Sequence, residues 1–72
     1  MNKLYRFMKE YANYQIKQIK ESCRTEYEKD ILIIRANRIV MDYRKGFITV
    51  GEAMKSLAKL DSNIRYGLDI DE

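Results

Sequence analysis

The first third of the chain alternates apolar and basic positions with a helical period. At about 100° per residue, lysines and arginines collect on one face. The opposite face is apolar and holds Leu4, Tyr5, Met8, Tyr11, Ala12, Ile16, Ile19 and Cys23. This pattern predicts an amphipathic helix over residues 3–24, with Cys23 buried as a small hydrophobic residue.

A second helix is predicted from a start signal and a stop signal. Thr25 is followed three residues later by Glu28, the spacing of a capping box, in which each side chain bonds the other residue's backbone N–H. Gly46 can take the left-handed conformation that ends a helix. We therefore expect a helix over residues 26–45.

The stretch RKGFITVGEA then joins this helix to a third one. Thr49 and Glu52 repeat the capping-box spacing, so a helix is expected to begin at Val50. Its apolar positions share one face over residues 50–66, opposite a polar face with Glu52, Lys55, Ser56, Lys59 and Asn63. The joint is therefore a helix stop followed directly by a helix start.

The fold class predicted from these segments is all-α, a small three-helix bundle in a single domain over residues 1–72. Its helices are expected at about 3–24, 26–45 and 50–66. A short fourth helix would follow if Asp61 or Ser62 capped a new start. Residues 67–72 are expected to form an acidic C-terminal tail, in which Leu68 and Ile70 can fold back onto the bundle.

The predicted second helix is apolar on two opposite sides. Its main core face holds Leu32, Ala36, Ile39, Val40 and Tyr43. The second side holds Tyr27, Ile31, Ile34 and Met41, and two arginines, Arg35 and Arg38, flank it. Together these six residues form our candidate partner-binding set. Either the first and third helices each cover one side, or the second side binds a protein partner or another copy of the chain as a homodimer.

Charge adds a second candidate surface. The chain has a formal net charge of +3, and its basic residues are concentrated toward the N-terminus. The polar side of the first helix carries a basic face with an aromatic border, formed by Lys3, Arg6, Lys17, Lys20, Arg24 and Tyr14. This face could bind nucleic acid or an acidic protein surface, or be a solvated helix face that Glu10 and Glu21 interrupt.

The segment ITVGEAMKSLAKLDSNIRYGL resembles the helix-turn-helix opening of excisionase and MerR-type regulators. The matching positions are Ile48, Thr49, Val50, Glu52, Ala53, Leu57, Ile64 and Arg65. At the turn, where that family has Gly and a small apolar residue, this chain has Ala58 and Lys59, both good helix formers. The resemblance implies DNA binding as an alternative function.

Composition argues against catalysis. The chain contains no His, so the commonest general base and metal ligand is missing. It also has no Gly-rich phosphate loop, and the acidic cluster of Asp69, Asp71 and Glu72 lacks the spacing of a calcium loop. We expect no enzymatic activity, no cofactor, no metal site and no small-molecule substrate.

One cysteine and the absence of a long apolar run predict a cytoplasmic protein that does not enter membranes. Taken with the two candidate surfaces, this favours a small helical regulator or inhibitor that binds a protein target. Its size and lack of motifs suit a phage or mobile-element product directed at a host nucleic-acid-processing or defence enzyme. A DNA- or RNA-binding module is the alternative.

Overall fold

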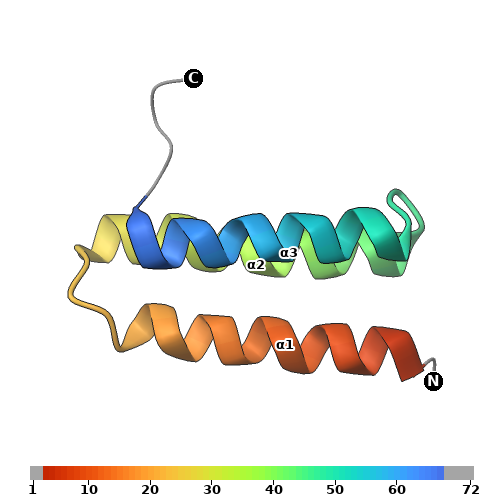
Figure 1. Cartoon of the computed structure of the whole chain (residues 1–72), viewed down its shortest axis with the longest axis horizontal. Helices are drawn as coiled ribbons and strands as arrows, with labels where there is room; N and C mark the ends of the chain where they lie inside the picture. Colours follow the sequence, from red (N-terminus) through yellow and green to blue (C-terminus); the bar gives the residue numbers. More distant parts are fainter. Residues whose placement is uncertain (1–2, 68–72) are drawn as a thin grey trace.

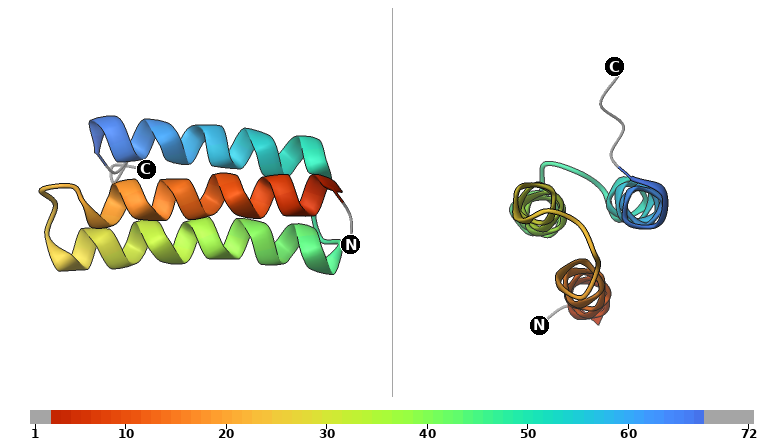
Figure 2. Two further views of the ribbon diagram at one scale, coloured as in Figure 1. Left: turned by 90° about the horizontal axis from the view of Figure 1, so that it is seen from below. Right: turned by 90° about the vertical axis from the view of Figure 1, so that its left-hand side faces the viewer.

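The computed structural model describes residues 3–67, which contain three α-helices, and each helix runs antiparallel to the one before it in the chain. They are α1 (Lys3–Lys20), α2 (Glu26–Lys45) and α3 (Val50–Tyr66). The helices run side by side, and the start of α1, the end of α2 and the start of α3 lie at the same end of the bundle (Figure 1). Seen end-on, they occupy the corners of a triangle, and each contacts the other two (Figure 2). The predicted all-α three-helix bundle is confirmed.

The helix starts follow the predicted caps. At α3 the capping box is complete, because the Thr49 hydroxyl accepts from the Glu52 backbone N–H at 3.1 Å and Glu52 accepts from the Thr49 N–H at 2.9 Å. At α2 only one of the two bonds forms, from the Glu28 N–H to the Thr25 hydroxyl at 3.2 Å. The two motifs are therefore alike in sequence and unequal in hydrogen bonding.

Gly46 ends α2 in the predicted manner. Its φ of 85° lies in the left-handed region that residues with a side chain rarely adopt. Its N–H donates to the Tyr43 carbonyl, and the Phe47 N–H donates to the Asp42 carbonyl, which is the hydrogen-bond pattern of a Schellman motif. The chain thus turns sharply toward Thr49 and α3.

α1 is shorter than predicted, since it ends at Lys20 and not at residue 24. The Ser22 hydroxyl and the Ser22 N–H both donate to the Ile19 carbonyl, at 2.7 and 3.1 Å. In a continued helix that carbonyl would accept from Cys23. Because Ser22 takes its place, the chain leaves the helix, and the expectation that Cys23 is buried is wrong: its side chain is exposed.

α3 is one continuous helix as far as Tyr66. It passes through Ala58 and Lys59 without the turn that a helix-turn-helix requires, and Asp61 starts no fourth helix within the described residues. Both outcomes agree with the strong helix propensity of this segment. The expectations for the acidic tail, including Leu68 and Ile70, fall on residues 68–72, which lie outside the described residues.

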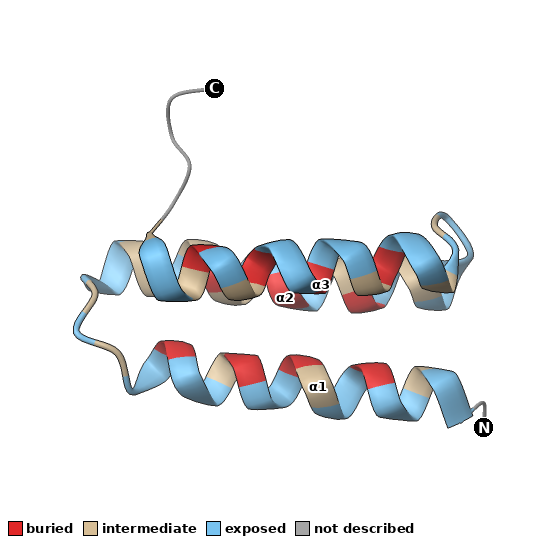
Figure 3. Cartoon of the chain, in the orientation of Figure 1, coloured by how far each residue is buried: buried red, intermediate tan, exposed pale blue. Residues whose placement is uncertain are grey.

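Buried positions, drawn in red, recur along all three helices (Figure 3). The hydrophobic ones among them form two clusters, one nearer each end of the bundle. The cluster nearer the start of α1 contains Met8, Ala12, Val40, Ala53 and Leu57. The other contains Ile19, Leu32, Ala36 and Leu60. Each helix contributes to both clusters from its predicted apolar face, so the periodicity correctly identified the inward side of every helix.

A polar contact between α1 and α3 lies between the two clusters. The side-chain amide of Gln15 is fully buried and donates to the Leu57 carbonyl at 2.9 Å and to Asp61 at 2.8 Å. The Tyr11 hydroxyl donates to the same carboxylate at 2.7 Å. This contact joins the middle of α1 to the middle of α3, and the sequence pattern did not predict it.

Candidate functional site

The outer face of α2 carries large apolar side chains that no part of the described chain covers. The exposed fractions are 74% for Tyr27, 63% for Ile34 and 40% for Met41, while Ile31 between them is half-buried. α1 and α3 both pack on the opposite side of α2, through its predicted core face. We call Tyr27, Ile31, Ile34 and Met41 the outer stripe. Of the two alternatives for this side of α2, the one in which α1 or α3 covers it is excluded.

The outer stripe has the repeat of a helix-packing seam. Tyr27, Ile34 and Met41 are spaced seven residues apart, so they lie almost in line along the helix axis over about 21 Å. Ile31 occupies the intermediate position between the first two. A seam of this kind matches the apolar face of another helix laid alongside it.

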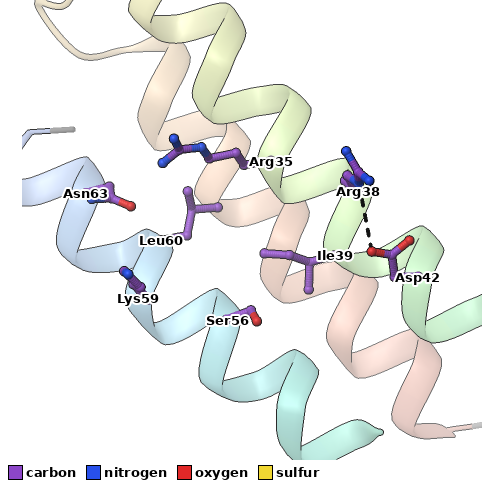
Figure 4. Close-up of a pocket in the computed structure, with 8 residues that line it drawn as sticks. All are labelled: Arg35, Arg38, Ile39, Asp42, Ser56, Lys59, Leu60 and Asn63. Atoms are coloured by element: carbon purple, nitrogen blue, oxygen red, sulfur yellow. Dashed lines mark ion pairs between the residues drawn. The ribbon is translucent and has the colours of Figure 1, made fainter. Parts of the chain in front are cut away.

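A groove between α2 and α3 adjoins the outer stripe. It has a volume of about 450 Å³, and its walls are formed by Arg35, Arg38, Ile39, Asp42, Ser56, Lys59, Leu60 and Asn63. Ile39 projects from α2 and Leu60 from α3 into the space between the helices, and Arg35 reaches from α2 toward Leu60 (Figure 4). The floor of the groove is thus apolar and its rim is polar.

The rim of this groove has an excess of positive charge. Arg38 pairs with Asp42 at 3.9 Å, but its side chain is 80% exposed, so the pair is weak. Arg35 and Lys59 form no ion pair with any residue of the described range. The structure therefore brings both predicted arginines together with a third cation, Lys59, beside the outer stripe.

The α3 residues of this groove were not part of the predicted site. Ser56 and Lys59 were assigned to the polar face of the third helix, and this assignment did not predict which neighbouring helix they would lie beside. Their spacing of three residues shows that they share an edge of the helix. Only the packing of α3 beside α2 places that edge next to Arg35 and Arg38.

Four cations of the predicted basic face lie exposed on α1: Lys3, Arg6, Lys17 and Lys20. Tyr14 at its border is 59% exposed, and its hydroxyl accepts a long hydrogen bond from Gln18 at 3.4 Å. Glu10 is also exposed on this helix. The basic face therefore exists, with the predicted interruption.

Arg24 is separate from the other cations of the basic face. Because α1 ends at Lys20, Arg24 lies in the connection to α2, and its guanidinium donates to the backbone carbonyls of Asn63, at 3.1 Å, and Ile64. These carbonyls are at the C-terminal end of α3, where the helix dipole favours a cation. Arg24 thus stabilises the end of α3, and its Nε is buried without a partner in the described chain.

Asn63 was expected on the polar face of the third helix and is instead only 4% exposed. Its side-chain amide donates to the Gly67 carbonyl at 3.2 Å, while its backbone carbonyl accepts from Arg24 and from the Gly67 N–H. The expectation of an exposed Asn63 is wrong, because these bonds satisfy the polar groups and allow them to be buried.

A metal-binding cluster and a membrane-spanning helix are both absent from the described residues. Among them, no three His, Cys, Asp or Glu side chains gather closely enough to hold a metal ion. No helix in the described range has a stretch of sufficient length and hydropathy to cross a bilayer.

Comparisons with models of known protein families, with curated proteins and with solved structures give no match.

Proposed function

We propose that this protein is a non-enzymatic regulator or inhibitor that binds a protein partner through the outer stripe of α2. The observation that supports this function best is the exposure of Tyr27, Ile34 and Met41 at seven-residue spacing on one helix. Exposed apolar side chains in a contiguous row are unusual on a monomer and are typical of interfaces. Tyr and Met are also enriched at such surfaces.

The chemistry of the partner follows from the shape and the charge of this surface. A straight apolar seam accommodates an amphipathic helix, whose own apolar residues would lie between Tyr27, Ile34 and Met41. The rim formed by Arg35, Arg38 and Lys59 favours acidic residues along one edge of that helix. The proposed target segment is thus an amphipathic helix with Asp or Glu beside its apolar face.

A second copy of the chain complements this surface less well. Two outer stripes packed together would bring two positively charged rims close to each other, and like charges at a buried interface are unfavourable. The rim cations Arg35 and Lys59 have no ion-pair partner of their own to offset this repulsion. A foreign acidic helix relieves the same charges.

The test compares wild-type protein with Ile34→Asp and with Asn13→Asp, which adds the same charge at an exposed position of α1. Each is used to capture proteins from an extract of the source cells, after circular dichroism has verified helix content. A protein retained by wild type and by Asn13→Asp is then purified, whether or not Ile34→Asp retains it, and its affinity for all three proteins is measured. We expect its affinity to fall at least tenfold with Ile34→Asp and to depend weakly on salt.

Two results would contradict the proposal. One is a folded Ile34→Asp variant that binds the same partner with unchanged affinity. The other is sedimentation of the wild-type protein as a dimer that Ile34→Asp converts to a monomer, because the outer stripe would then be covered by a second copy of the chain.

A further inference from the structure

A second groove lies at the end of the bundle where α1 begins and α2 ends. Its volume is about 590 Å³, within the range of ligand sites. The side chains that form it are Tyr5, Arg6, Lys9, Tyr43, Arg44 and Ile48. None of them belongs to the outer stripe of α2 or to the groove beside α3, so this is a separate surface.

The charges of this groove are all of one sign. Arg6, Lys9 and Arg44 are exposed, and none of them forms an ion pair within residues 3–67. No acidic side chain of the described chain lines the groove. An anion would find three unpaired cations here.

The floor of this groove is aromatic and apolar. Tyr5, Tyr43 and Ile48 are half-buried and pack against the core cluster that contains Met8 and Val40. Their positions are therefore held by the core, while the three cations of the groove are exposed to solvent. Surfaces that bind single-stranded nucleic acid combine aromatic rings with cations, because bases stack on the rings and phosphates pair with the cations. This groove contains both components.

We propose that this groove binds a short stretch of single-stranded nucleic acid. Arg6 and Lys9 lie one helical turn apart on α1 and contact successive phosphates, and Arg44 contacts a phosphate from the facing helix. A base stacks on Tyr5, beside Tyr43 in the floor. An acidic peptide would satisfy the three cations but would leave the aromatic floor without a matching group, so nucleic acid is the better complement.

The experiment measures binding of a short fluorescent oligothymidylate by anisotropy at several salt concentrations. Three neutralised phosphates give a slope of about −2 in log affinity against log salt for a single strand, and one gives about −0.7. We expect the larger slope for wild type and the smaller one for the double variant Arg6→Gln with Arg44→Gln. The control, Arg35→Gln with Arg38→Gln, removes two arginines from the other groove and should keep the wild-type slope.

Tyr5→Leu tests the aromatic floor separately. It leaves the cations in place, so the salt slope should stay unchanged while affinity falls about tenfold. Circular dichroism of each variant verifies that the bundle is folded.

Three outcomes would overturn the proposal. The first is no binding by wild type at low salt, and the second is an equal loss of slope in the two double variants. The third is equal affinity for polyglutamate with the same response to Arg6→Gln and Arg44→Gln, which would assign the groove to acidic protein segments. None of them bears on the outer stripe, whose test depends on Ile34.

Discussion

Tyr11, Gln15 and Asp61 form a polar contact that interrupts an otherwise apolar interface between α1 and α3. The Asp61 carboxylate accepts from both other side chains, and Gln15 also reaches the Leu57 carbonyl. The Gln15 carbonyl oxygen, in contrast, is buried without a partner in the described chain. Buried polar groups of this kind favour one alignment of two helices over others, since a shift along the axis would break several bonds together.

This contact has a measurable effect on ionisation. The hydrogen bond that Tyr11 donates to Asp61, together with burial and the nearby carboxylate charge, raises the pKa of Tyr11 above its ordinary value of 10.0. The folded state therefore favours the neutral phenol. The resulting stabilisation is present below about pH 10 and is lost as pH rises through the pKa of the folded state.

We predict that Asp61→Asn lowers the pKa of Tyr11 toward that of a free tyrosine. The free energy of unfolding of this variant should then decrease less above about pH 10 than that of the wild type. NMR titration of labelled tyrosines, with Tyr11→Phe to assign the signal, measures the change. Asp30→Asn makes the same charge change at an exposed position of α2 and should leave Tyr11 unaffected. An unaltered Tyr11 titration in Asp61→Asn would disprove the hydrogen bond.

The helices differ in how their ends are stabilised and in how many neighbours they have. α3 begins with two reciprocal capping bonds and ends on the Arg24 guanidinium, whereas α2 begins with a single capping bond. α2 also carries the outer stripe on the side that α1 and α3 leave uncovered. It therefore serves both as a core element and, in our proposal, as the interaction surface.

The unequal caps predict unequal effects of the same substitution. Thr49→Ala removes one bond of a complete capping box and should cost about 1–2 kcal/mol, while Thr25→Ala should cost about 0.5–1 kcal/mol. Urea unfolding of both variants, followed by circular dichroism, gives the two values. Equal losses, or a larger loss for Thr25→Ala, would show that the capping bonds at the two starts are equivalent.

A chain of 72 residues has little stability to lose, about 4–11 kcal/mol for a domain of this size. Its two core clusters are built from nine side chains, of which three are alanines. Leaving Tyr27, Ile34 and Met41 outside that core forgoes apolar burial that so small a domain could use. This is the pattern expected when an exposed surface is retained for binding.

We predict that Leu57→Ala destabilises the fold by about 2–5 kcal/mol, because it opens a cavity in a fully buried position. Ile34→Ala should change stability by less than about 0.5 kcal/mol. Chemical unfolding at two protein concentrations checks both values. A large, concentration-dependent loss for Ile34→Ala would mean that the outer stripe is buried between copies of the chain.

Local signals along the chain were sufficient for the helices and for the inward side of each one. Capping residues, Gly46 and the apolar period act over a few neighbouring positions, so they can be read without knowing the fold. The candidate arginines of α2 were found in the same way. The end of α1 was missed because Ser22, a neutral residue in the helical pattern, takes the Ile19 carbonyl.

Contacts between distant residues required the packed structure. Gln15 looks like a surface residue in the pattern, and it is buried because Asp61, 46 positions away in the chain, supplies a partner for its side-chain amide. The buried Asn63 side chain bonds the nearby Gly67 carbonyl, and the Asn63 backbone carbonyl accepts from Arg24, 39 positions away. Likewise, the period distinguished the core face of α2 from a second apolar side, but only the triangular packing showed that α1 and α3 leave this second side uncovered. Both grooves also required the packed structure, since each exists only where two helices meet.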